Sequence, residues 1–351
     1  MKSKIFNIFS IIFLSILIIL YSIRFIYYYK IEHKVYNETT KLVDVIKENV
    51  NVHENSGTYL YDSVSTNNYL YYLGRIWRII SIDNSINIIT EDIETLINYD
   101  DIDNWDKIFK ASLKNDYNVR LLTKDEYNKL DEYNYLNNKT PYWINEGYIE
   151  DGKVYEVADK MFGVRPVISI GLDSIYSKGN GRIDNPYEIV GDPVTTLKDC
   201  YVGQYITYSN LKWRVIGQED DKTKLVLMDT IDYEDYQDNF YESLENKDYI
   251  VSGTYNVGSF RESYLDTLED TKELEVGTLS LGDFYINEYP DVITMTPYAY
   301  QSSSSYVINS KNMLYIDIIN SKYKVRPVIY LDNNLFVVSG NGYTEAYKVG
   351  R

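Results

Sequence analysis

The sequence has little of the chemistry on which metal and redox sites depend. Its 351 residues include one cysteine, Cys200, and two histidines, His33 and His53. A single cysteine excludes an intramolecular disulfide, and a structural zinc site needs more cysteine or histidine ligands than this chain offers. Both histidines lie in a polar stretch ahead of the repeated segments, and we interpret them as solvated. We therefore predict no catalytic residue, no cofactor-binding residue and no metal ligand, which favours a binding protein over an enzyme.

Positive charge is also scarce. The chain has 35 Lys and Arg residues against 52 Asp and Glu residues, for a net charge of −17. The basic residues at the N-terminus make residues 1–34 net positive, so the remainder of the chain is strongly acidic. Such a body repels nucleic-acid phosphates and has no basic patch that would release counterions. We therefore expect no nucleic-acid partner.

One long apolar run occurs at the N-terminus. Residues 5–23 carry no charge, and at about 1.5 Å per residue they would span about 28 Å as a helix, close to the thickness of a bilayer's hydrocarbon core. The alternative is a cleaved signal peptide, but no alanine precedes Ala111 to form the usual cleavage pattern. We predict a cytoplasmic tip and transmembrane signal anchor over residues 1–34, with a membrane contact through residues 5–28. The expected location is the cell membrane, single-pass, with an extracellular C-terminal body.

A short helical stretch follows the apolar run. Leu42, Val45, Ile46 and Val50 fall on one face of a helix. Residues 35–56 are therefore predicted to form a helical stalk and linker, with the stalk docking on the domain that follows it.

The strongest pattern in the chain is an internal repeat. "VRPVISIGLDSIYSKGNG" from Val164 returns as "VRPVIYLDNNLFVVSGNG" from Val325. Two hairpin patterns containing "IWRII" and "KWRVI" precede these segments, each with alternating apolar residues around a polar turn. Further blocks match in the same order, and they predict two copies of one domain, the first over 57–193 and the second over 194–351.

Short motifs in both copies carry a resemblance to a known family. The set comprises "WRII" and "WRVI", "SFRESYL", "LTKDEY" and "LSLGDFY", "PYW" and the two "VRPVI" segments. Together they resemble an uncharacterised surface domain of unknown function from Firmicutes exported proteins. That domain is similar to the C-type-lectin-like fold, in the variant shared with formylglycine-generating enzymes. Those enzymes depend on cysteines or a metal, and Cys200 at the domain junction does not match that requirement.

The predicted fold class is α+β. It consists of two tandem, mainly antiparallel lectin-like domains preceded by a transmembrane helix. Helical segments are expected from Asn104, from Leu121 and from Gly258, and Thr123 with Glu126 has the spacing of a capping box.

Several residues that the two copies share have both a structural and a functional interpretation. Trp77 and Trp213 are predicted to be core residues. Arg165 and Arg326 are expected to pair with groups of their own domains, although an arginine can also bind a ligand carboxylate or phosphate. The "GNG" segments predict tight turns with positive φ. The acidic stretch 99–106 lacks the glycine and the terminal glutamate of a calcium loop.

The loops in which the copies diverge contain the predicted ligand-binding residues. Trp143, Tyr148, Tyr298 and Tyr300 lie in or beside "TPYWINEGYIEDGKVY" and "TPYAYQSSSSYVINSKNMLY", where aromatic rings can stack on sugars or pack against a partner. The alternative places these rings in the core or at a sheet edge.

The functional hypothesis is a membrane-anchored extracellular binding or interaction protein. A cell-wall glycan or a surface protein is the expected partner. Two alternatives stay open, namely an enzyme acting on cell-envelope glycans and a structural component of a surface assembly.

Overall fold

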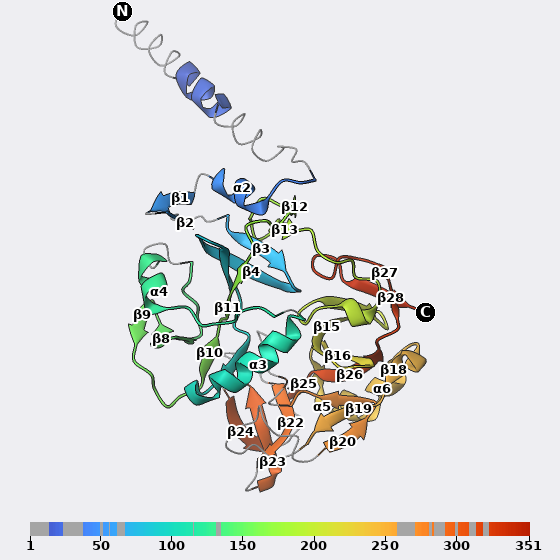
Figure 1. Ribbon diagram of the computed structural model, residues 1–351. Helices are drawn as coiled ribbons and strands as arrows, with labels where there is room; N and C mark the ends of the chain where they lie inside the picture. The colour runs from blue at the N-terminus through green and yellow to red at the C-terminus, as the bar shows by residue number, and fades with distance from the viewer. Residues whose placement is uncertain are drawn as a thin grey trace, which may run out of the picture.

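The computed structural model of the chain is mostly β (Figure 1). It describes residues 14–23, 38–49, 52–55, 57–61, 67–114, 116–130, 135–257, 271–280, 283, 292–298, 301–308, 314–318 and 323–351. The predicted α+β class is wrong, because two large sheets curl into half-barrels and the described helices are short. The resemblance to a lectin-like fold stays a prediction. Tyrosine and β-branched residues are abundant throughout the chain, and they favour strands over helices.

The first copy is built on an eight-stranded sheet. Its strands are β1 (Val52–Asn55), β2 (Thr58–Tyr61), β3 (Tyr69–Tyr72), β4 (Arg75–Ile82), β5 (Ile86–Thr90), β11 (Val167–Ile170), β12 (Tyr176–Lys178) and β13 (Tyr187–Ile189). Strand β13 runs parallel to β3, whereas the other pairs of this sheet are antiparallel.

The second copy has an eight-stranded sheet with a matching central order. Its strands are β14 (Tyr205–Tyr208), β15 (Leu211–Gln218), β16 (Lys222–Leu227), β18 (Ile250–Val251), β21 (Val276–Thr278), β26 (Pro327–Asp332), β27 (Phe336–Ser339) and β28 (Tyr347–Gly350). Here β28 runs parallel to β14, as β13 does to β3 in the first copy.

Each copy also has a five-stranded sheet with the same pairing order. In the first copy it comprises β6 (Thr95–Ile97), β7 (Tyr142–Ile144), β8 (Gly147–Glu150), β9 (Lys153–Tyr155) and β10 (Phe162–Val164). In the second it comprises β17 (Ile231–Asp232), β22 (Val292–Tyr298), β23 (Gln301–Ile308), β24 (Leu314–Ile318) and β25 (Lys324–Val325). A further two-stranded sheet joins β19 (Gly253–Asn256) to β20 (Thr271–Leu274).

The helices beyond residue 40 are short. They are α2 (Leu42–Lys47), α3 (Ile102–Ser112), α4 (Lys124–Leu130), α5 (Tyr233–Asp238) and α6 (Phe240–Ser243), with 3-10 turns η1 (Tyr99–Asp101), η3 (Leu197–Asp199) and η4 (Lys247–Tyr249). Helices α3 and α4 confirm the helical segments predicted from Asn104 and Leu121. The capping box is also present, because Thr123 N donates to Glu126 at 2.9 Å and Glu126 N donates to Thr123 Oγ1 at 3.2 Å. The segment predicted to be helical from Gly258 lies outside the described residues.

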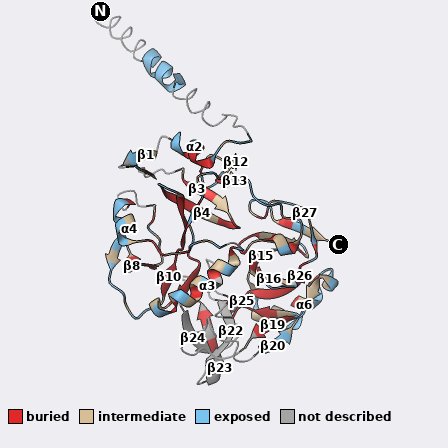
Figure 2. Ribbon diagram, in the orientation of Figure 1, coloured by how far each residue is buried: buried red, intermediate tan, exposed pale blue. Residues whose placement is uncertain are grey.

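Each copy has one of the two predicted hairpins at the centre of its core. Strands β4 and β5 pair in one copy and β15 and β16 in the other. Figure 2 shows β4 and β16 mostly buried, whereas most residues of β15 are not fully buried. Trp77 and Trp213 are both completely buried. Each indole N–H donates to the carbonyl five residues earlier, Trp77 to Tyr72 at 2.8 Å and Trp213 to Tyr208 at 3.0 Å. The core role predicted for both tryptophans is confirmed.

The "GNG" segments form the predicted turns with positive φ. Gly179 and Gly340 have φ values of 96° and 100°, and Gly181 and Gly342 have values of 78° and 71°. A Cβ atom on Gly179 would lie 1.8 Å from a backbone oxygen, and one on Gly340 would lie 2.4 Å from the matching oxygen. Only glycine therefore fits where each turn approaches the next strand.

The segment predicted as a stalk belongs to the first core. Helix α2 buries Leu42, Val43, Val45 and Ile46 in that core. Leu42 N donates to Ser174 O at 2.8 Å, in the same way that Leu197 N donates to Leu335 O at 3.0 Å in the second copy. The predicted docking of this stalk on the first domain is therefore confirmed, and backbone hydrogen bonds extend the correspondence between the copies to residue 42. The start of the first copy at residue 57 stays a prediction.

The predicted transmembrane helix is a second correction. Residues 14–23 are helical and expose large apolar side chains, whereas residues 5–13 and 24–28 lie outside the described part of the chain. No described helix is both long and apolar enough to cross a membrane. The membrane partner and the extracellular location stay predictions.

The two copies contact each other through hydrogen bonds and through aromatic rings. The Arg75 guanidinium, held by Glu94 at 3.1 Å, donates to Val202 O at 3.0 Å. Lys114 Nζ donates to Lys198 O at 2.6 Å. The β3–β4 turn of the first copy thus lies against the segment that enters the second copy.

Candidate functional site

The aromatic residues predicted to bind ligand in the first copy are core residues. Trp143 is completely buried, and its indole N–H donates to Ile97 O at 2.9 Å. Tyr148 is 8% exposed, and its ring lies 4.3 Å from that of Phe162. Neither ring is open for a sugar to stack on, because strands β7 and β8 turn both inward.

The second pair of predicted residues lies at the end of β22. Tyr298 is the last residue of that strand and pairs with Gln301 of β23. Tyr300 lies outside the described residues. The ligand-binding prediction for these two tyrosines stays a prediction.

The repeated arginines make the internal contacts expected of them. Arg165 is 1% exposed, and its guanidinium donates to Thr90 O and Leu136 O, each at 2.8 Å. Arg326 is also buried and donates to Met228 O. In both copies the arginine thus ties the start of the strand after "VRP" to backbone carbonyl groups.

Other candidate groups are also structural. The acidic stretch 99–106 forms η1 and the start of α3, and no group of three His, Cys, Asp or Glu suited to a metal ion occurs in the part of the chain that the structure describes. The Cys200 thiol is buried, and burial raises its pKa to about 12 despite the opposing effect of Lys114. At neutral pH it is therefore a protonated core group.

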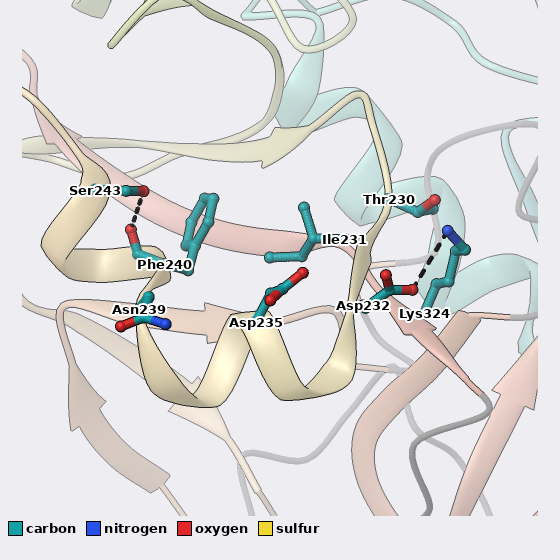
Figure 3. A pocket seen from close by; sticks show the side chains of 8 residues that line it. All are labelled: Thr230, Ile231, Asp232, Asp235, Asn239, Phe240, Ser243 and Lys324. Carbon is teal, nitrogen blue, oxygen red and sulfur yellow. Dashed lines mark hydrogen bonds and ion pairs between the residues drawn. The ribbon is translucent and has the colours of Figure 1, made fainter.

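A hollow of about 370 Å³ opens on the second copy instead (Figure 3). Its volume is near the lower end of the ~300–1,000 Å³ range of small-molecule sites. Most of its lining side chains are polar: Thr230, Ile231, Asp232, Asp235, Asn239, Phe240, Ser243 and Lys324. The hollow therefore combines hydrogen-bonding groups and charges with two apolar side chains.

Seven of the eight lining residues lie in, or directly beside, strand β17, helix α5 or helix α6. Asp232 ends β17 and precedes α5, whose first turn is acidic, an arrangement that suits the helix dipole. Asn239 separates α5 from α6 with a φ of −139°, so the chain bends there around the hollow. Phe240, the buried residue of α6, anchors the bend, with its ring 6.3 Å from that of Trp213.

Strand β25 closes the other side of the hollow. Its residue Lys324 pairs with Asp232 in the strand ladder, and Lys324 Nζ lies 3.4 Å from Asp232 Oδ1. Both side chains are more than half exposed, at 52% and 63%. Such a pair contributes only about 0–1 kcal/mol to folding.

The first copy fills the corresponding positions differently. Val164 of the first "VRPVI" pairs with Thr95, and Val325 of the second pairs with Ile231. The pair Leu96 and Gly163 therefore stands where the second copy has Asp232 and Lys324. A Cβ atom on Gly163 would lie 2.6 Å from the Ile93 side chain, so the first copy has no room for a lysine. Asp232 and Lys324 form the charged rim of the hollow, and this rim is thus specific to the second copy.

Sequence reasoning missed these residues because it looked for aromatic rings in the longest divergent loops. The usable signal was a difference between the two copies at aligned positions. "FGVRP" in the first copy becomes "YKVRP" in the second, which places a lysine directly before a shared motif. Strand register then identifies Asp232 as its partner.

Comparisons of the chain with known protein families, with curated proteins and with solved structures find no match.

Proposed function

We propose that this chain is a binding protein whose ligand site is the hollow of the second copy. The observation that carries the proposal is the exchange of Gly163 and Leu96 in the first copy for Lys324 and Asp232 in the second. An exposed ion pair adds little to stability, and it replaces a closely packed apolar arrangement. A ligand that needs hydrogen bonds and charge accounts for such a change.

The lining favours a small polyhydroxylated ligand, such as one or two sugar units of a glycan. Carboxylate oxygens accept hydrogen bonds from sugar hydroxyls, and the Lys324 ammonium donates them. Asn239 supplies both a donor and an acceptor. Ile231 is half-buried and offers apolar surface to the face of a sugar ring, whereas the buried ring of Phe240 anchors the bend between α5 and α6. Ligand sites commonly have a mostly apolar lining, whereas six of the eight lining side chains here are polar, which suits a ligand with many hydroxyl groups.

The first copy supports the second as a scaffold in this proposal. Its own aromatic candidates are buried, and its β3–β4 turn is fixed to the segment at Val202. The duplication thus supplies a stable body, and one copy has diverged at its rim.

A glycan array probed with the full chain, followed by calorimetry on the hits, tests the proposal. Asn239→Trp places a large ring in the hollow and is expected to abolish binding. Asp238→Trp is the matched control, because Asp238 is exposed on α5 and does not line the hollow. Binding that survives Asn239→Trp, or an array without any bound glycan, would overturn the proposal.

A further inference from the structure

We infer that the ligand of this hollow is an amino sugar, in which a protonated amine pairs with the carboxylate of Asp235. This inference rests on the proposed function and specifies its ligand. It follows from the balance of charge inside the hollow, from the charge around it, and from the hydrogen-bonding groups beside Asp235.

The charges inside the hollow do not cancel. Lys324 lies 3.4 Å from Asp232, so this cation already has a partner. Asp235 also lines the hollow, and in Figure 3 its side chain lies between those of Asn239 and Asp232. Among the described residues, no cation forms an ion pair with Asp235. The site therefore keeps one negative charge that a ligand can neutralise.

The surrounding segment strengthens the preference for a cation. Residues 232–248 contain seven acidic residues and one basic residue, Lys247. Lys247 is paired with Glu242 at 2.6 Å, and Arg351 is paired with Asp248 at 2.8 Å. The remaining carboxylates produce a negative potential around α5, which concentrates cations at the surface of the hollow.

The other lining groups distinguish an amino sugar from a simple amine. Thr230 and Ser243 bring hydroxyl groups, and Asn239 brings an amide. These groups can form hydrogen bonds with the hydroxyls of a sugar ring, whereas the methylene chain of a polyamine offers them no hydrogen-bonding partner. A polyamine also needs several carboxylates spaced along its length, whereas Asp235 is the one unpaired carboxylate that lines the hollow within the described chain.

Calorimetric titration of the full chain with two matched probes tests the inference. The first probe is a glucosamine trisaccharide with free amines, and the second is the same trisaccharide with every amine acetylated. Asp235 is exposed, so its pair with an amine is screened by solvent, and we expect the free-amine probe to bind about three- to fivefold more tightly. Raising the salt concentration should weaken this probe selectively, since exposed charges are screened.

Two variants assign the effect to one carboxylate. Asp235→Asn keeps the shape of the side chain and is expected to remove the preference for the free-amine probe. Asp238→Asn changes the net charge equally on the same helix but outside the hollow, and it should keep the preference. Circular dichroism of both variants checks that the fold is retained.

The outcomes separate the inference from the proposed function. Equal binding of the two probes that is blocked by Asn239→Trp would overturn the amino sugar and leave the hollow as a glycan site. Preference for a linear polyamine over the free-amine trisaccharide would also overturn it. Failure of the free-amine trisaccharide to bind would overturn the amino sugar, and failure of every glycan on the array would overturn the proposed function as well.

Discussion

The rings of Tyr71 and Tyr343 stack across the boundary between the two copies, with centroids 4.4 Å apart and planes inclined by 20°. Beside this stack, Gln204 Nε2 donates to the Tyr71 hydroxyl at 3.2 Å and to the Tyr347 hydroxyl at 3.4 Å. A side chain from the start of the second copy thus bridges tyrosines from both. These contacts therefore hold the two copies in one relative orientation, unlike domains that are joined by a linker alone.

Close backbone approach at this boundary gives a first prediction. Gly203 has a φ of 103°, and a Cβ atom on it would lie 2.4 Å from Gly74 O. Alanine would be strained by its φ and would also force the two copies apart. We expect Gly203→Ala to lower the free energy of unfolding by about 2 kcal/mol, as measured by urea denaturation.

Gly191 is the control for this substitution. It lies close to the same boundary in sequence, but a Cβ atom on it meets nothing within 4 Å. We expect Gly191→Ala to change the unfolding free energy by less than about 0.5 kcal/mol, or to stabilise slightly. Equal effects of the two substitutions would contradict a close-packed boundary.

The pH dependence of stability gives a second prediction. Burial alone would raise the pKa of Asp199, but hydrogen bonds from Thr195 and Thr196 outweigh it and hold the pKa at about 2. A folded-state pKa below the unfolded value of 3.8 means that the carboxylate stabilises the fold above about pH 4. This contribution is lost as the pH falls from about 4 to about 2.

Substitution of Asp199 isolates that contribution. The difference in unfolding free energy between the wild type and Asp199→Asn should be constant above about pH 4 and shrink toward pH 2. Asp220→Asn, at an exposed position in the β15–β16 turn, is the comparison. A difference for Asp199→Asn that grows as the pH falls would have the wrong sign and would refute the assignment.

The repeat and its hairpins could be predicted because they depend on local patterns. The alternation around Trp77 and Trp213 specifies strands, and the glycines at 179 and 340 specify turns. The predicted fold class was wrong because local residue patterns do not specify how the strands assemble into sheets or how those sheets curl. The correspondence of Leu42 with Leu197 could not be predicted from the sequence, because it consists of backbone hydrogen bonds, which many side chains permit.

The candidate site was harder to predict for a physical reason. Aromatic residues in a divergent loop suit a sugar site and a small core equally well, and Trp143 lies in such a core. The hollow depends on the pairing of Lys324 with Asp232, which are far apart in sequence. Only strand register brings the two together.

The core position of Trp143 gives a third prediction. Its ring lies 4.9 Å from the ring of Phe162 and 5.2 Å from that of Tyr99. Trp143→Ala should therefore lower the unfolding free energy by about 3–5 kcal/mol through the cavity it leaves. Val190→Ala, at a 63% exposed position, is the control and should have little effect. A stable Trp143→Ala protein that loses only ligand binding would restore the ring as a ligand contact.

Exchange of the rim between copies gives the last prediction. The double substitution Asp232→Leu and Lys324→Gly gives the second copy the residues that the first copy has at these positions. Because the ion pair is exposed, its removal should change the unfolding free energy by no more than about 1 kcal/mol. Binding of the free-amine trisaccharide should weaken at least tenfold, as measured by calorimetry. Removal of an equally exposed pair by Arg182→Gln and Asp184→Asn, which line no part of the hollow, should leave binding unchanged. Equal loss of binding in both double variants would show that general charge, and not this rim, holds the ligand.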